Sequence, residues 1–328
     1  MHHSTISFVG RRLAQGVIVI FAVATLVFVL LHAAPGDPLA VLGDQPQLSP
    51  DAVARLRRSF GLDQPIPTQY ARYLGNLARG EFGISLTQHR PVLTAIGDAL
   101  PNTLLLAAAA LLVDFAVGIG VGVVQGARGR SRVDALLSLV TVTLYSTPVF
   151  WLGLVLLVLF AQTLGWLPAG GTVDPIGHAA LPLAGRALDR VRHLALPALT
   201  LGLAAAGYTA RHQRSAMLEA IGQDFVRTAR AKGLRERTVV LRHALRNALL
   251  PTITLAGIAF PVLLSGTVLV ETVFSWPGMG RLAADAIGRR DYPVVTGAAI
   301  LAAAMVVIGN LLADLAARLA DPRIRRSA

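Results

Sequence analysis

The chain has 328 residues, of which 54% are hydrophobic and only 15% are charged, and its mean hydropathy is +0.60. A soluble domain carries about 25% charged residues, so these values exclude a soluble protein and indicate an integral membrane protein. The sequence contains no cysteine, which excludes disulfides, thiolate chemistry and cysteine-based metal sites.

Six segments are long and apolar enough to cross the roughly 30 Å of hydrocarbon in a bilayer. The predicted fold is therefore all-α, with six transmembrane helices and a small helical extracytoplasmic insert between the first and second. The first apolar run is longer than that of a signal peptide, so we expect it to remain as a span. The expected spans are 11–33, 101–126, 135–163, 194–217, 248–271 and 293–318. Residues 1–33 then form the N-terminus with the first span, 34–100 the insert, and 101–328 a core of five spans.

Basic residues are distributed unevenly between the predicted loops. With the N-terminus inside, the inner side carries 18 Lys and Arg against 5 acidic residues, and the outer side carries 12 against 10. Cytoplasmic loops carry the excess of Lys and Arg in membrane proteins. We therefore expect both termini to be cytoplasmic, and we attribute the net charge of +12 to topology and not to nucleic-acid binding.

The insert begins where the sequence APGDP at 34–38 breaks the first helix, because proline disfavours helical backbone at the preceding residue. A short helix is expected after Ser49, and a second from near Pro67 to just before Gly80. One face of the second helix carries four larger side chains: Tyr70, Tyr73, Leu74 and Leu77. Such an amphipathic insert could lie as a cap on the membrane surface.

The second and third spans contain unusual residues. Asp114, near the middle of the second span, is expected to face protein or a water-filled cavity, and a structural hydrogen bond is favoured over a substrate or ion contact. Three glycines in the same span allow close helix packing: Gly118, Gly120 and Gly122. In the third span, Pro148 predicts a bend, because it frees a backbone carbonyl.

Residues of the third and fifth spans are candidates for the translocation path or its gate. The fifth span has two prolines and should bend readily. The candidates are Ser146, Pro148, Phe150, Pro261 and Ser265. A kink needed only for packing is the alternative interpretation.

The outer loops carry few signals. His178 and His193 lack metal-ligand spacing and are interpreted as ordinary surface residues, so no metal site is expected. Further on, Pro277 and Gly278 fit the central positions of a type II turn. Trp276 suits the membrane interface, where its ring would be half-buried.

The most polar stretch is the predicted inner loop 218–247. Three apolar residues recur every four positions near its start and should line one face of a short helix: Ile221, Phe225 and Ala229. Gly233 is expected to end this helix, and a second basic helix should run from about Arg235 towards Pro251. Two short helices joined at a glycine suggest a docking element, although a basic loop could serve topology alone.

The spelling of this loop resembles a known family. RTARAKG at 227–233, followed by Leu250–Pro251, resembles the "EAA" coupling loop of ATP-binding-cassette (ABC) importer permeases, which inserts into a separate ATPase. Arg227 and Thr228 stand where the consensus has Glu and Ala, and the distance to Leu-Pro is longer. Both departures are usual in the peptide and nickel branch of the family, whose own version is similar to QDFVRTARAKG.

Further pieces resemble the same branch in the same order: APGDP at 34–38, GLDQPIPTQYARYLGNLARGEFGISL at 61–86, S-x-P-x-F at 146–150, ETVFSWPGMG at 271–280 and DPRIR at 321–325. The chain is thus similar to the B-type permease subunit of dipeptide, oligopeptide and nickel importers, which have the type I ABC importer fold. The resemblance implies half of a translocation path for di- or oligopeptides. It also implies a C-type second permease subunit, two ABC ATPase subunits or domains, an extracytoplasmic solute-binding protein and the bacterial inner membrane.

The resemblance further implies which residues contact the ATPase: Asp224, Phe225, Arg227, Thr228, Ala229, Arg230, Ala231, Lys232 and Gly233. Among these, Ala229, Ala231 and Gly233 would provide a small-residue contact.

Import of nickel or another small solute stays open. A membrane-embedded enzyme would need acid–base or metal groups in the spans, but Asp114 and Asp314 have no His partner at metal spacing. A passive channel would not need a coupling loop. The single lysine, Lys232, does not fit the GxxxxGK[ST] phosphate-binding loop. We therefore predict a transport subunit without enzymatic activity or cofactor, driven by ATP hydrolysis on another polypeptide.

Overall fold

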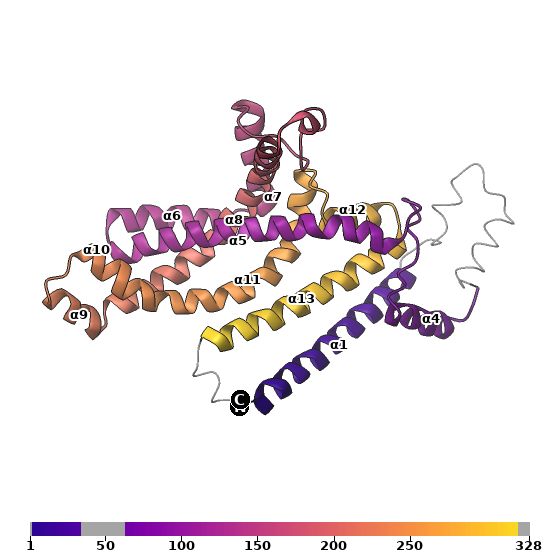
Figure 1. Cartoon of the computed structure of the whole chain (residues 1–328), viewed down its shortest axis with the longest axis horizontal. Helices are drawn as coiled ribbons and strands as arrows, with labels where there is room; N and C mark the ends of the chain where they lie inside the picture. The colour runs from indigo at the N-terminus through magenta and orange to yellow at the C-terminus, as the bar shows by residue number, and fades with distance from the viewer. Residues whose placement is uncertain (1, 34–62, 321–328) are drawn as a thin grey trace. The chain divides into compact units, whose positions relative to one another are not determined.

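The computed structural model describes residues 2–33 and 63–320, and their side chains except at 2–7, 254–266 and 316–320. All regular elements in this part of the chain are helices (Figure 1). They are α1 (His2–Ala33), α4 (Ile66–Ala78), α5 (Val92–Ala127), α6 (Arg132–Ser146), α7 (Val149–Leu156), the π-helix η1 (Leu157–Thr163), the 3₁₀-helix η2 (His178–Ala180), α8 (Leu183–Ile221), α9 (Asp224–Ala231), α10 (Glu236–Thr238), the π-helix η3 (Val239–Ala244), α11 (Leu245–Val273), α12 (Met279–Gly288) and α13 (Tyr292–Ala320).

The chain divides into two compact units. Unit 1 comprises Met1–Pro101 and Gly278–Val307, and unit 2 comprises Asn102–Pro277 and Ile308–Ala328. Each unit has its own apolar core. That of unit 1 includes Val92, Ile96 and Met279, and unit 2 has two separate clusters.

The predicted spans are found as helices at nearly the expected positions. Within the described residues, three helical segments are long and apolar enough to cross a membrane: Phe8–Ala33, Val92–Ala127 and Tyr292–Leu315. The bent pair Arg132–Ser146 and Val149–Thr163 becomes a fourth if it is one span. The other two expected spans, 194–217 and 248–271, lie within α8 and α11, which are unbroken helices of 39 and 29 residues.

In unit 1, α4 confirms the predicted second helix of the insert, and its tyrosines face α1. The Tyr70 hydroxyl lies 2.7 Å from Thr25 Oγ1, and the Tyr73 hydroxyl donates to the Ala24 carbonyl at 3.1 Å. Burial, assisted by Tyr70, raises the pKa of Tyr73 to about 12, so this hydroxyl keeps its proton and acts as a donor. The tyrosine face therefore packs on α1. The helix expected after Ser49 and the APGDP segment lie outside the described residues.

A second tie in unit 1 is built on Asp291, just before α13. This buried carboxylate accepts hydrogen bonds from the hydroxyls of Ser85 and Thr87 and from the backbone N–H groups of Leu86 and Thr87. Burial by itself raises the pKa of Asp291, but these hydrogen bonds outweigh it, and the pKa lies below its ordinary value. Asp291 thus anchors the end of the insert to the start of α13.

In unit 2, α5 packs closely along α8. A Cβ atom added at Gly118 would lie 2.7 Å from Thr209 Cβ, and one at Gly122 would lie 2.6 Å from Gln213 Cβ. Gly118 meets Thr209 and Gly122 meets Gln213, so residue numbers increase in the same direction along the contact. Helices α5 and α8 therefore run parallel. The predicted close packing is confirmed for Gly118 and Gly122, whereas nothing lies within 4 Å of a Cβ at Gly120.

The predicted bend of the third span is confirmed and is larger than a kink. Helix α6 ends at Ser146, and Thr147 adopts an extended conformation with φ −77° and ψ 129°. The axes of α6 and of the following helical segment differ by 107°. Proline at 148 accounts for the break, because it disfavours helical backbone at the residue before it.

The segment that follows α11 differs from the sequence prediction. Gly278 has φ −100° and ψ −178°, so Pro277 and Gly278 do not form a type II turn, which requires positive φ at the glycine. The side chain of Trp276 is only 2% exposed, and its Nε1 donates to the Asn102 carbonyl at 3.0 Å. Trp276 therefore packs inside unit 2 and is not half-buried at a membrane surface.

Candidate functional site

The candidate site is the elbow formed by α9 and α10 in unit 2. Helix α9 starts at Asp224, directly after the turn that ends α8. Gly233 follows α9 with φ +74°, a left-handed conformation that favours glycine, and its N–H donates to the Arg230 carbonyl at 2.9 Å. The predicted short helix and its glycine stop are therefore confirmed.

The buried face of α9 matches the predicted apolar face only in part: Ala229 is buried and Ile221 packs against the same cluster, but Phe225 does not belong to it. Val226 and Ala229 are 0% and 4% exposed, and they share a cluster with Met217 and Ala220 of α8. Phe225, which was expected on the same face, is 39% exposed. Residues three apart lie on the same side of a helix, so Val226 and Ala229 form the buried side of α9, with Val226 in the place expected for Phe225.

This seating divides the predicted coupling residues into two groups. Ala229 contacts its own chain, so the small-residue contact expected from it is not open to another protein. The remaining predicted residues are exposed: Asp224, Phe225, Arg227, Thr228, Arg230, Ala231, Lys232 and Gly233. Arg227 and Asp224 form only a loose, exposed pair at 3.4 Å.

Arg230 has a partner that sequence reasoning did not identify. Its Nη2 and Nε donate to the two carboxylate oxygens of Glu236, at 2.7 and 3.1 Å. The hydrogen bonds from Arg230 lower the pKa of Glu236, and those to Glu236 raise the pKa of Arg230. The pair spans the turn at Gly233 and connects α9, which contains Arg230, to α10, which begins at Glu236. The opposite charges on either side of a predicted glycine turn are the signal that could have found it.

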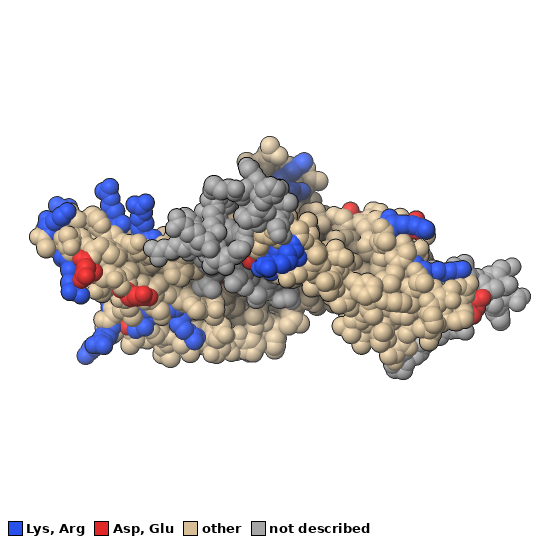
Figure 2. Space-filling model, turned by 90° about the horizontal axis from the view of Figure 1, so that it is seen from below, with Lys and Arg blue, Asp and Glu red and all other residues tan. Residues whose placement is uncertain are grey.

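The second helix of the elbow is longer than predicted. It begins at Glu236, passes through the π-helix η3, and continues as α11 through Pro251 without a break. The predicted basic helix from about Arg235 towards Pro251 is therefore confirmed, and it is continuous with the fifth predicted span. Lys and Arg side chains gather over the end of unit 2 that carries α9 and α10 (Figure 2).

The residues proposed for the translocation path are only partly described. Ser146 is the last residue of α6, Pro148 precedes α7, and Phe150 in α7 is 44% exposed, so these three lie together at the bend. Pro261 and Ser265 belong to α11, and their side chains lie outside the described residues.

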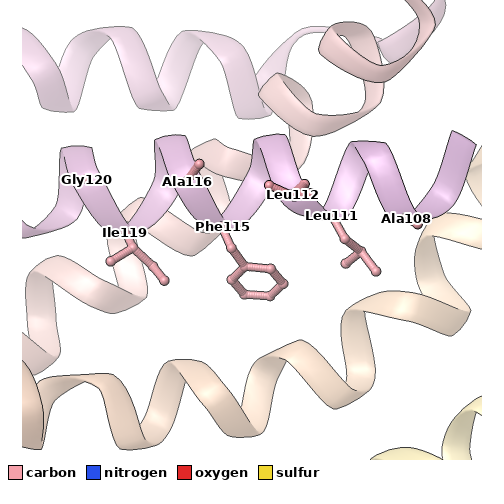
Figure 3. A pocket seen from close by; sticks show the side chains of 7 residues that line it. All are labelled: Ala108, Leu111, Leu112, Phe115, Ala116, Ile119 and Gly120. Atoms are coloured by element: carbon pink, nitrogen blue, oxygen red, sulfur yellow. The ribbon is translucent and has the colours of Figure 1, made fainter. Parts of the chain in front are cut away.

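An apolar groove of about 800 Å³ lies along one side of α5. The side chains of Leu111, Phe115 and Ile119 point to the same side of the helix (Figure 3). The groove is lined by Ala108, Leu111, Leu112, Phe115, Ala116, Ile119 and Gly120. None of these was among the predicted path residues, although their three- and four-residue spacing is visible in the sequence.

The histidines of the outer loop are not ordinary surface residues. His178 Nδ1 lies 2.7 Å from Asp189 Oδ2, and His193 Nδ1 lies 3.1 Å from Oδ1 of the same carboxylate. Burial by itself raises the pKa of Asp189. The hydrogen bonds from the Asp174 N–H and from His178, together with the nearby His193, outweigh this effect, so the pKa of Asp189 lies below its ordinary value. No group of three side chains able to hold a metal occurs in the part of the chain that the structure describes.

Asp114 is buried in unit 2, with 1% of its surface exposed. Thr209 of α8 is the polar side chain that interacts with it. The second carboxylate oxygen, Oδ1, has no hydrogen-bond partner among the described residues.

The helices have the fold of a type I ABC importer permease. The fold is similar to that of a chain in the inward-facing MetNI methionine ABC transporter, with a TM-score of 0.53 and 18% identity over 70% of this chain and 97% of that one.

The chain belongs to the family described as the binding-protein-dependent transport system inner membrane component. It matches this family over residues 118–326, and the corresponding N-terminal family over residues 5–107. It is 42% identical to the di/tripeptide transport system permease protein DppB of Pseudomonas aeruginosa over 98% of this chain and 99% of that protein. It is 38% identical to the oligopeptide permease AppB of Bacillus subtilis (97% and 99%) and to the dipeptide permease DppB of Escherichia coli (98% and 99%).

Membership of this family confirms the resemblance drawn from the motifs. The chain is an integral membrane component of a transport system and not an enzyme. The all-α class and the type I importer fold are likewise confirmed.

Proposed function

We propose that this chain is the permease subunit of an ATP-driven importer, in which α9 is the element that engages the ATPase. The observation that carries the proposal is the two-sided character of α9. Its Val226–Ala229 side is buried in unit 2, while its other sides present Phe225, Arg227 and Lys232. A separate protein could bind the exposed basic and aromatic surface of α9, and the buried side of α9 would transmit the force to the rest of unit 2.

The seating suggests how force enters the chain. Val226 and Ala229 share one cluster with α8, with Val239 and Ala244 of η3, and with Ala248 of α11. When the ATPase displaces α9, α8 and the start of α11 are expected to move with it. ATP drives this movement only if the ATPase binds the two states of the permease with different affinity.

The proposed orientation places both termini in the cytoplasm of a bacterium, with the importer in the inner membrane. The excess of basic residues in the inner loops supports this orientation. The parallel packing of α5 on α8 supports one intervening span between them, and it is compatible with either orientation of the termini.

Di- or oligopeptides delivered by an extracytoplasmic binding protein are the proposed substrates. Three relatives named for di/tripeptide, oligopeptide and dipeptide transport support this assignment. The proposed assembly contains a C-type second permease and two ATPase subunits or domains. Nickel or another small solute is the alternative.

The coupling role is tested with surface substitutions in the complete importer. We expect Arg227→Glu and Phe225→Asp to leave the chain in the membrane but to abolish both co-purification of the ATPase and ATP-dependent uptake of a labelled dipeptide. Arg72→Glu, an equally exposed charge reversal in α4, is the matched control and should change neither. Normal uptake in both α9 variants would contradict the coupling role.

The substrate is tested separately with the unmodified importer. We expect binding protein loaded with a dipeptide to stimulate the ATPase, and labelled dipeptide to accumulate in vesicles. Stimulation by nickel alone, with no response to peptides, would favour the alternative solute and leave the coupling role intact.

A further inference from the structure

The carboxylate of Asp134 connects α8, the helix that precedes α9, to the hairpin formed by α5 and α6. Arg214 of α8 donates from Nε to Asp134 Oδ1 and from Nη2 to Oδ2, both at 2.7 Å. The Asp134 side chain is 5% exposed and that of Arg214 is 31% exposed. Two parallel, charge-assisted hydrogen bonds fix both the distance and the relative orientation of α6 and α8.

Asp134 has further partners on the hairpin. The Arg130 N–H donates to Oδ2 at 3.0 Å, and this residue has a left-handed φ of +63°, which is unfavourable for a residue with a side chain. The Ser138 hydroxyl lies 3.4 Å from Oδ1 and accepts from Gln125 Nε2 at 2.9 Å. A single chain of hydrogen bonds therefore joins α8, α6 and α5.

These bonds lie close to the elbow along the chain. Arg214 is seven residues before Ile221, the last residue of α8, which corresponds to about 10 Å along a helix. Between them lies Met217, which is fully buried in the same cluster as Val226 of α9. The hairpin also contacts this stretch directly, because a Cβ added to Gly129 would lie 2.8 Å from Leu218 Cδ2.

We propose that Asp134 and Arg214 are positioning residues, which carry the displacement of α9 and α8 to α6 and so to the bend at Thr147. The proposal rests on the coupling role of α9 proposed above. The opposite end of α6 is the 107° break, so a rotation of α6 changes the direction of the segment beyond it. Close packing at Gly207 also holds α8 against α6, and the bidentate ion pair adds a directional constraint at the other end of α6.

A purely structural role is the competing explanation. A buried ion pair is often no more stabilising than an apolar pair of similar volume, whereas removing one partner leaves an uncompensated charge. Single substitutions therefore confound stability with coupling. The double variant Asp134→Asn with Arg214→Gln removes both charges together and separates the two effects.

The experiment uses the complete importer in proteoliposomes and measures dipeptides transported per ATP hydrolysed. We expect this ratio to fall about tenfold, within the usual range of coupling energies, in Arg214→Gln and in the double variant. Arg214→Lys keeps the charge without the planar fork, and its ratio should be intermediate. ATPase co-purification should stay normal in all three, which distinguishes failure of this proposal from failure of α9 docking.

The control is Asp285→Asn in α12, which removes an exposed pair whose atoms are 3.8 Å apart and should leave the ratio unchanged. If Arg214→Gln is lost from the membrane, the double variant and Arg214→Lys decide the outcome. Uptake that falls only in proportion to the amount of assembled importer, with an unchanged ratio in these variants, would overturn the proposal.

Discussion

Replacement of Gly122 by alanine tests the packing of α5 on α8. The added Cβ would lie 2.6 Å from Gln213 Cβ and 2.7 Å from the Ala210 carbonyl oxygen. The second neighbour belongs to the backbone, so it cannot move away by a side-chain rotation. The two helices must separate locally, and overpacking of this kind costs about 1–3 kcal/mol.

Gly120→Ala is the matched control, because it lies two residues away in the same helix and no atom lies within 4 Å of its added Cβ. In a helix interior, alanine is more favourable than glycine by roughly 1 kcal/mol. This gain applies equally to both variants and cancels when they are compared. The difference in the free energy of unfolding between the variants should therefore be about 1–3 kcal/mol.

Thermal unfolding of the purified chain in one detergent measures this difference. Gly122→Ala should unfold at least about 2 °C below Gly120→Ala, with normal insertion of both. Close backbone approach at small residues is a main source of helix association within membranes. Equal unfolding temperatures would show that the glycine contacts do not hold α5 against α8, and the inferred parallel packing would lose its support.

Three further substitutions test other parts of the chain. Gly233→Val should retain insertion but lose ATP-dependent uptake, because left-handed backbone costs roughly 1–2 kcal/mol for a residue with a side chain. The control is Gly80→Val, at φ +75° and with no atom within 4 Å of the added Cβ, which should keep its uptake. The folded-state pKa of Asp291 is lowered, so its contribution to stability is present above about pH 4 and is lost as the pH falls further. Asp291→Asn should have a lower unfolding temperature at pH 7 and should lack this loss of stability in acid. Pro148→Ala should straighten the bend, seen as a longer distance between spin labels on cysteines introduced at Leu139 and Leu159 in this cysteine-free chain.

The sequence predicted those features that depend on neighbours along the chain. The break before Pro148 and the stop at Gly233 follow from local backbone preferences, which act in any surroundings. The positions of the helices expected as spans follow from the length of apolar runs. The elbow of α9 and α10 was located by its charge and its glycine, and the family motif suggested the coupling role proposed for it.

Features that depend on distant parts of the chain were missed. Trp276 has the composition of an interfacial residue, and only the position of the Asn102 carbonyl makes it an internal one. His178 reaches Asp189 because η2 lies against the first turns of α8, whereas His193 is one helical turn from the same carboxylate and its spacing was visible in the sequence. Phe225 was predicted on the apolar face of α9 in place of Val226 for the same reason, since the residues that cover this face belong to α8, η3 and α11.

The burial of Val226 limits how an ATPase can act on this chain. The Val226 side chain is fully buried, and such burial contributes about 1.5–3 kcal/mol, so α9 has little reason to leave its seat when it is displaced. The deformation must then occur where regular packing is already interrupted. The bend at Thr147, with its 107° change of direction, is such a place, and the Asp134–Arg214 bonds join it to the helix that carries α9. Under the coupling role proposed for α9, force applied at the elbow would therefore change the path of the third span while α8 stays intact.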